Sequence, residues 1–441
     1  MRYIANTEAD RRAMLDVVGV SSLEELFSDI PRQVRDRYQP IGLPERSELE
    51  TVRKVQKLAH FNAVWEQYTS FLGGGVYDHY IPRVVPYVTS RSEFSTAYTP
   101  YQPEMSQGTL TAMFEFQTLL CELTGMNVAN SSMYDGATAL AEAVFMAERI
   151  AKTDKVAVCR SLYPHYRQVL DTYCQAGGIE IVEVPYDHAG RYNADSLPTK
   201  ISALVVQSPN TFGIIEEMNG LKERLGAALL IVAINPISLG LIAPPGKAGA
   251  DIVVGEGQPL GLSPSFGGPF LGLFACRKQY LRSMPGRIIG RTVDAQGEIA
   301  YTMTSQTREQ HIRRGRATSN ICTNSTLCAL AAAVYLAGLG GHGLQELALL
   351  NLEKAHYLAE RIGSLPGYSL AFSGPFFNEF VISVPGDPQS VYRQLAHDKI
   401  LANNPSSLSE LGVEQALSFA VTEQRTKEEL DSLVNVLRDM T

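Results

Sequence analysis

The sequence lacks the patterns that mark metal, redox and nucleic-acid proteins. Its six cysteines stand at positions 121, 159, 174, 276, 322 and 328. None forms a Cys-x-x-Cys pair, which argues against a zinc ribbon or dithiol centre and fits reduced thiols in the cytoplasm. The eight histidines include no His-Glu-x-x-His spacing, so no metal site is expected. A formal charge of −8 argues against a broad cationic surface for nucleic acid.

Long hydrophobic runs are also lacking. The longest, Leu327–Leu339, is shorter than the ~20 residues that span a bilayer, so a buried helix is expected there. Residues 1–16 are charged throughout and carry no basic-then-apolar signal. With 45% hydrophobic and 19% charged residues, the composition suits a globular protein with a substantial core. We therefore expect a cytoplasmic protein without a membrane partner.

Three regions are expected along the chain. Residues 1–65 form an arm, because Thr7–Val18 has helical spacing and Ser21–Glu25 has the pattern of a second capped helix. The arm either wraps a partner or lies on its own domain. Residues 66–322 are expected to form a large α/β domain, and residues 323–441 a small α+β domain.

Apolar strands alternate with helices in the large region. We expect these strands at residues 155–159, 179–185, 203–207, 228–234, 251–254 and 270–276. Their mostly continuous apolar character predicts a mainly parallel sheet covered on both faces. Ligands of such sheets bind at the carboxyl ends of the strands.

A lysine is missing after the expected strand at 251–254. The segment GADIVVGEGQPLG at 249–261 resembles the strand and turn that present the Schiff-base lysine in pyridoxal-phosphate (PLP) enzymes of the aspartate aminotransferase fold, fold type I. No lysine occurs from Ala248 to Arg277, and Gln258 or Pro259 stands at that place. A glutamine amide cannot form an imine, so the reactive centre is expected in another chain.

Two further positions agree with that expectation. Enzymes of this fold keep the pyridine nitrogen protonated with an aspartate, where this chain has the neutral Asn235. Residues 136–138 open a helix whose amino terminus could bind phosphate. Asp135 brings an anion to that place, however, and is expected to be the helix N-cap.

Two polar segments are candidates for a site or an interface. The first segment, residues 306–322, contains the cationic or titratable side chains of Arg308, His311, Arg313, Arg314 and Arg316. Arginine binds carboxylate and phosphate through a rigid fork, although each arginine alone would fit a solvated surface. The second segment, residues 91–109, is rich in tyrosines, hydroxyls and amides and is too polar for a core.

Several long segments resemble the first subunit of the glycine cleavage system P-protein in its split, two-subunit form. They are FLGGGVYDHYIP at 71–82, YTPYQPEMSQGTL at 98–110, SMYDGATALAEA at 132–143, INPISLGLIAPPGKAGADIVVGEGQPLG at 234–261 and TREQHIRRGRATSNICTN at 307–324. The resemblance runs to about residue 326 and is looser beyond it. The loop at 400–407 lacks the glycines expected there, which leaves its local shape open.

This resemblance implies a PLP-dependent enzyme that decarboxylates glycine and passes the aminomethyl group to the lipoyl arm of the H-protein. It also implies a homologous second subunit that carries the lysine and PLP, in an αβ or α2β2 complex. The present chain would then complete the active site at the interface. The missing lysine is what this arrangement requires.

The resemblance further suggests roles for six residues. Thr318 and Asn320 are expected to approach the phosphate of the partner's PLP. Tyr98 and Tyr101 are expected to line the channel for glycine or the lipoyl arm. Arg308 or Arg313 is expected to pair with an anionic group.

Two alternatives stay open. The chain could be an autonomous PLP enzyme that uses Lys247 or Lys278. It could also be a non-catalytic scaffold that only stabilises its partner. The polar loop at 98–107 favours a subunit that shares the active site.

Overall fold

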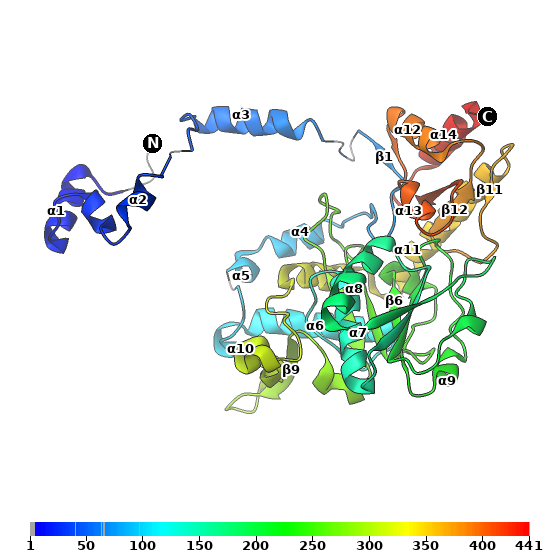
Figure 1. The fold of residues 1–441 in the computed structure, drawn as a ribbon, viewed down its shortest axis with the longest axis horizontal. Helices are drawn as coiled ribbons and strands as arrows, with labels where there is room; N and C mark the ends of the chain where they lie inside the picture. Colours follow the sequence, from blue (N-terminus) through cyan, green and yellow to red (C-terminus); the bar gives the residue numbers. More distant parts are fainter. Residues whose placement is uncertain (1–4, 40, 63, 65–66, 97, 441) are drawn as a thin grey trace. The chain divides into compact units, whose positions relative to one another are not determined.

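The computed structural model describes residues 5–39, 41–62, 64, 67–96 and 98–440. The chain divides into two units, Met1–Ala63 and Val64–Thr441. They are drawn in Figure 1 and are described separately. The division of the second unit near residue 322 stays a prediction.

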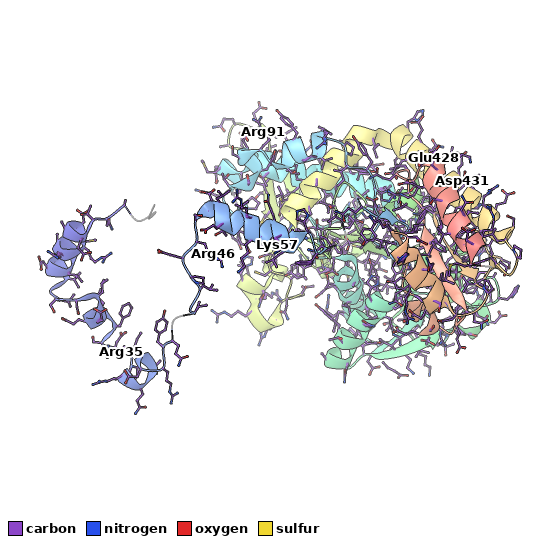
Figure 2. The ribbon with its side chains drawn as sticks, turned by 90° about the horizontal axis from the view of Figure 1, so that it is seen from above. Arg35, Arg46, Lys57, Arg91, Glu428 and Asp431 are labelled. Carbon is purple, nitrogen blue, oxygen red and sulfur yellow. The ribbon has the colours of Figure 1, made fainter. Side chains whose placement is uncertain are left out.

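The amino-terminal unit consists of short helices. They are α1 (Glu8–Val18), a 3-10 helix (Leu23–Phe27), α2 (Arg32–Arg35) and α3 (Glu48–Ala59). The predicted helix at 7–18 is confirmed, with Thr7 as its N-cap. The helix α3 was not predicted, although Ser47 and Glu50 form a capping box at its start. None of α1, α2 and α3 contains a buried residue, and Arg35 on α2 and Lys57 on α3, labelled in Figure 2, are both exposed.

A seven-stranded sheet forms the centre of the second unit. Its order is β2 (Val128–Ala129), β8 (Gly272–Cys276), β7 (Ile252–Glu256), β6 (Leu229–Ile234), β5 (Ala203–Ser208), β3 (Lys155–Cys159) and β4 (Glu180–Val184). Strands β4, β3, β5, β6 and β7 are parallel, and β8 is antiparallel to both of its neighbours. The prediction of a mainly parallel sheet is confirmed.

Alternate residues of the strands supply two cores, one on each face of the sheet. On one face, Leu204 and Val232 pack with α6 (Gln107–Thr124) and α11 (Thr326–Gly363). On the other, Val205 and Ile231 pack with α7 (Gly136–Ala151) and α8 (Pro164–Gly177). Helices cover both faces of the sheet (Figure 1), which explains why an inner strand such as β6 is apolar throughout, whereas the edge strand β4 carries Glu180 and Glu183.

The helix α11 continues from the large sheet into the carboxyl-terminal part. It bends at Gly340, whose φ of 62° is not helical. It is the helix of the described residues that is long and apolar enough to cross a membrane by length and composition alone. Ala332, in the segment predicted as a buried helix, is fully buried in one core, and Leu358, beyond that segment, is fully buried in another.

The carboxyl-terminal part contains a three-stranded antiparallel sheet. Its strands are β11 (Ser369–Leu370), β12 (Glu379–Ser383) and β14 (Ala416–Ala420), and it packs with α12 (Pro388–His397) and α14 (Lys427–Asp439). Strand β13 (Ile400–Leu401) pairs in parallel with β1 (Thr69–Ser70). The start of the second unit therefore lies along this carboxyl-terminal part.

A two-stranded hairpin, β9 (Ile288–Val293) and β10 (Ile299–Thr304), was not predicted. The remaining helices are α4 (Val84–Thr89), α5 (Ser92–Ser95), α9 (Leu221–Leu225), α10 (Gln310–Arg313) and α13 (Ser406–Ser409). Short 3-10 helices occur at Pro103–Met105, Ala194–Ser196, Pro236–Gly240, Lys278–Ser283, Gln306–Arg308 and Arg314–Arg316.

Candidate functional site

The carboxyl end of β7 meets the amino terminus of α7. Asp135 caps this helix, with Oδ1 accepting the N–H of Thr138 at 2.8 Å, so the predicted N-cap is confirmed. The last residue of β7, Glu256, accepts the N–H of Gly136 at 3.0 Å through Oε2. The free N–H that could have bound a phosphate therefore binds a carboxylate of the same chain.

Two further N–H groups converge on Glu256. Oε1 accepts the backbone N–H of Gln258 at 2.9 Å and that of Leu271 at 3.0 Å. Burial raises the pKa of Glu256 to about 7, against the opposing effect of these three donors. The carboxylate thus joins β7, the turn after it and the start of α7.

Gln258, at the place expected for the lysine, is fully buried. Its Oε1 accepts the N–H of Tyr77 at 2.9 Å, and its Nε2 donates to the carbonyl oxygens of Tyr77 at 3.0 Å and Leu262 at 2.7 Å. The lysines of the autonomous-enzyme alternative, Lys247 and Lys278, are both exposed.

The residues at this place do not fit PLP. Tyr166 comes so close that a Cβ on Gly136 would lie 1.8 Å from its hydroxyl oxygen. The neutral Asn235 accepts the N–H of Ile237 at 3.0 Å, which closes a turn, and its Nδ2 donates to Oδ1 of Asn378 at 3.5 Å. The site has a carboxylate where the phosphate would bind and a buried amide where the imine would form. We therefore assign no cofactor step to it.

A cavity of about 300 Å³ opens beside Glu256. Its polar lining includes Tyr134, Asp135 and His165. Burial lowers the pKa of His165. Two carboxylates without an arginine or lysine in the described lining make this cavity unsuited to an anionic cofactor.

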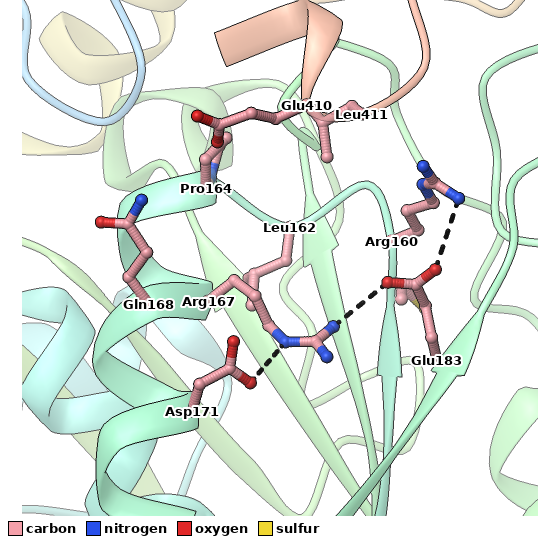
Figure 3. A pocket seen from close by; sticks show the side chains of 10 residues that line it. Arg160, Leu162, Pro164, Arg167, Gln168, Asp171, Glu183, Glu410 and Leu411 are labelled. Atoms are coloured by element: carbon pink, nitrogen blue, oxygen red, sulfur yellow. Dashed lines mark hydrogen bonds and ion pairs between the residues drawn. The ribbon is translucent and has the colours of Figure 1, made fainter.

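A second cavity, of about 340 Å³, lies at the carboxyl ends of β3 and β4 (Figure 3). Arg167 binds Asp171 at 2.8 Å and Glu183 at 3.4 Å, and Arg160 binds Glu183 at 3.5 Å. These charges pair with one another across the cavity wall, which indicates a structural role.

Glu379, on β12, binds the glycine segment that precedes Tyr77. It accepts the N–H of Gly74 at 3.1 Å, the Tyr77 hydroxyl at 3.0 Å and Nδ2 of Asn403 at 3.1 Å. The Tyr77 and Tyr163 hydroxyl oxygens lie 2.9 Å apart. Burial raises the pKa of Glu379 to about 7. Asn403 belongs to the loop at 400–407, so that loop contributes to a buried network.

The two predicted tyrosines lie next to the arginine-rich segment. Tyr98 is 80% exposed, and its hydroxyl lies 3.1 Å from Oγ1 of Thr323. Tyr101 is 55% exposed and meets the ring of His311 at a centroid distance of 6.1 Å. The structure therefore brings together two polar segments that are more than 200 residues apart in the chain.

Beneath these tyrosines lies Arg287, which was not predicted. It is 3% exposed, and its Nη1 donates to Thr99 at 3.3 Å and to Asn324 at 3.1 Å. Its guanidinium carbon lies 5.7 Å from the centre of the Tyr101 ring. The only signal in the sequence is a lone arginine after the turn residues Pro285 and Gly286, which does not reveal these partners.

Glu309 adds a negative charge to this cluster. Its Oε2 lies 3.9 Å from Nε of Arg287 and 3.6 Å from Nδ1 of His311. A buried ion pair thus lies directly beneath an exposed surface of tyrosine, histidine and hydroxyl groups. We call the set Tyr98, Thr99, Tyr101, Arg287, Glu309, His311, Thr323 and Asn324 the tyrosine–arginine surface.

The predicted arginines differ in placement. Arg308 is buried, and its guanidinium donates to the carbonyl oxygens of Met284, Gly286 (3.0 Å) and Ser305 (3.1 Å). Burial lowers its pKa. Arg313 is exposed. Only Arg313 of this pair is therefore placed to meet an external anion.

The predicted phosphate contacts lie in the segment that follows. Thr318 is half-buried, and its N–H donates to the carbonyl oxygen of Arg308 at 2.9 Å. Asn320 is exposed, and its side chain has no hydrogen-bond partner in the described part of the chain. The inward-facing Arg308 therefore fixes the segment that carries both residues.

Comparisons with known proteins agree with this geometry. A family model described as "Glycine cleavage system P-protein" matches residues 1–437. The "Probable glycine dehydrogenase (decarboxylating) subunit 1" of Desulfitobacterium hafniense is 52% identical over 440 residues, 98% of each chain. The protein of the same name from Thermotoga maritima is 51% identical over 439 residues, 99% of each chain.

Solved structures extend the agreement. A glycine decarboxylase (P-protein) of the glycine cleavage system, in inhibitor-bound form, has a TM-score of 0.93 and 41% identity, covering 100% of both chains. A glutamate decarboxylase from Lactobacillus brevis has a TM-score of 0.68 and 14% identity, covering 93% of this chain and 96% of that one, and shows the fold alone. The predicted fold type I architecture is confirmed.

Proposed function

This chain belongs to the glycine cleavage system P-protein family, and we propose that it is the subunit of a two-subunit P-protein that carries no cofactor. It takes part in glycine decarboxylation as one component of that enzyme. The homologous second subunit holds PLP covalently. The observation that carries this proposal is Gln258, buried and fully hydrogen-bonded where the cofactor's lysine would stand.

The tyrosine–arginine surface is the part of this chain that faces the partner's cofactor. Support comes from its construction: the exposed Tyr101 lies over a buried arginine and the exposed Tyr98 bonds Thr323, an arrangement more ordered than a solvated loop needs. In this role the tyrosines line the channel for glycine or for the lipoyl arm of the H-protein. Thr318 and Asn320 approach the cofactor phosphate from the same face.

The partner's PLP supplies the electron sink for the carbanion left by decarboxylation. The residues of this chain bind and orient. Arg313, which is exposed, supplies positive charge to an anionic group, whereas Arg308 positions the segment that carries Thr318. The tyrosines shield the channel from water. The enzyme is cytoplasmic and works with the lipoylated H-protein, without nucleic acid or membrane.

Glycine–bicarbonate carboxyl exchange tests this function. It is measured with PLP and H-protein for this chain alone, for its partner alone and for the mixture. Exchange only in the mixture is the expected result. Exchange by this chain alone, with an absorbance band near ~420 nm that borohydride removes, would instead support the autonomous enzyme.

A scaffold role is the second candidate, and the same assay separates it. The comparison uses assembled complexes that carry Tyr98→Ala, Tyr101→Ala or Asn320→Ala. A scaffold requires that turnover per assembled complex stays at the wild-type level. A shared site requires that turnover falls while the complex still forms.

A further inference from the structure

The amino terminus of α7 already has an anionic ligand. One N–H of the helix, that of Gly136, and two N–H groups outside it, those of Gln258 and Leu271, point at the carboxylate of Glu256 within 3.0 Å. The side chain is 5% exposed. Helix amino termini bind anions because their first N–H groups lack partners inside the helix and the helix dipole adds positive potential.

We propose that Glu256 is a built-in anion that takes the place of an external phosphate at α7 and holds this site closed. The inference goes beyond the proposed function, because it concerns the folded chain itself and not the reaction of the complex. The anion site persists, and its ligand is internal.

The geometry of the three donors distinguishes an anion from a neutral side chain. Oε2 of Glu256 accepts a hydrogen bond from the N–H of Gly136, whereas Oε1 accepts hydrogen bonds from the N–H groups of both Gln258 and Leu271. A glutamine has one acceptor oxygen, so its NH₂ group would face at least one of these N–H groups. Glu256→Gln keeps the volume and loses this match. Glu256→Ala keeps the donors and removes the anion.

The cavity beside Glu256 gives a small anion access to the site once Glu256→Ala has removed one of the two carboxylates in its lining. It has a volume of about 300 Å³, and Glu256 forms part of its wall. Acetate carries the same carboxylate that Glu256→Ala removes. Acetate should therefore enter the variant and bind the vacated N–H groups.

The experiment measures the Tm of the full chain in sodium acetate and in sodium chloride at equal ionic strength. It is run at about pH 8, above the pKa of about 7 of Glu256, so that the carboxyl is ionised. The variants are Glu256→Ala, Glu256→Gln and Glu216→Ala. Glu216 is the matched control: it is buried and accepts from Asn210 (2.8 Å) and from the N–H of Tyr192 (3.1 Å), not from a helix terminus.

We expect all three variants to lose several degrees of Tm. Acetate should restore at least half of that loss in Glu256→Ala and none of it in Glu256→Gln or Glu216→Ala. The inference is overturned if acetate leaves a folded Glu256→Ala unchanged. It is also overturned if acetate raises the Tm of Glu216→Ala by the same amount.

Should Glu256→Ala fail to fold, Glu256→Gln decides the question. At about pH 8 its Tm should lie below that of the wild type. At about pH 5.5 the difference should be larger, because the pKa of Glu256 is raised to about 7 in the folded chain and protonation therefore stabilises the wild type, whereas the variant does not titrate. Equal Tm values of Glu256→Gln and wild type at about pH 8 would overturn the inference.

Discussion

The side-chain amide of Gln258 binds the backbone of Tyr77 on both sides. Its Oε1 accepts the Tyr77 N–H at 2.9 Å, and its Nε2 donates to the Tyr77 carbonyl oxygen at 3.0 Å. Both residues are buried, so the N–H and carbonyl groups of Tyr77 cannot form hydrogen bonds with water instead. The position that would carry the reactive lysine therefore joins the glycine segment at 73–75 to the turn after β7.

Replacing Gln258 by lysine should not create a cofactor site. Gln258→Lys leaves the Tyr77 N–H without an acceptor and buries an amine, so the free energy of unfolding should fall by about 2 kcal/mol or more. Urea unfolding measures this loss. Gln296→Lys, at an exposed position, should unfold like the wild type. An absorbance band near ~420 nm after PLP is added to Gln258→Lys would contradict the prediction.

Stability should fall as the pH rises toward neutrality. Burial raises the pKa values of Glu216, Glu256 and Glu379 to about 7 in the folded chain, from 4.5. Between these values the folded chain holds more protons than the unfolded chain. Each carboxyl therefore contributes stability below about pH 4.5 that is lost as the pH passes 7.

The contribution of one carboxyl can be isolated by mutation. Urea unfolding of wild type and Glu216→Gln at about pH 5 and about pH 7.5 gives two pH slopes. The variant should show the flatter decline, because it has one fewer buried group to ionise. Glu414→Gln, at an exposed position, serves as the control. Identical declines in wild type and Glu216→Gln would exclude the assigned role of Glu216.

Substitution of the two predicted arginines by lysine should change the free energy of unfolding by different amounts. Arg308 donates to three carbonyl oxygens through its fork, and lysine cannot reach all of them. Arg308→Lys should lower the free energy of unfolding by about 2 kcal/mol. Arg313→Lys, at an exposed position, should stay within about 0.5 kcal/mol of the wild type. Equal losses would mean that Arg313 has a structural role as well.

The sheet could be predicted because its signal is local. Strands β5 and β6 are buried at every residue, so their apolar runs stand out in the sequence. The hairpin of β9 and β10 has no such signal, because most of β9 is half-buried or exposed. Its support is remote: Gln117 bonds both the N–H and the carbonyl oxygen of Ile289, 172 residues away.

The same limit applies to the candidate site. The N-cap Asp135 and the missing lysine could be predicted, since each depends on neighbouring residues. Glu256 and Arg287 could not, because their partners lie 120 and 188 residues away in the chain, at Gly136 and Thr99. Arg308 was expected at a ligand, and its burial among carbonyl oxygens follows from the turn at 284–286, which the sequence pattern does not reveal.

Arg287 should act on the reaction through Tyr101 and Thr99, which it contacts. Its Nη1 binds Thr99 and Asn324, and its guanidinium lies 5.7 Å from the centre of the Tyr101 ring. Lysine keeps the charge but cannot make this set of contacts. In complexes with the partner subunit, Arg287→Lys should lower kcat/KM for glycine exchange by about tenfold, the effect of losing about 1.4 kcal/mol of transition-state stabilisation.

Arg291→Lys is the matched control, since Arg291 lies four residues further along, on the exposed end of β9. It should form the complex and exchange glycine like the wild type. If Arg287→Lys assembles normally and loses turnover, Arg287 positions the surface that meets the partner's site. If its activity per assembled complex equals that of Arg291→Lys, the tyrosines do not depend on Arg287. If the wild-type pair shows no exchange, the proposed function itself is wrong, and the arginine is not tested.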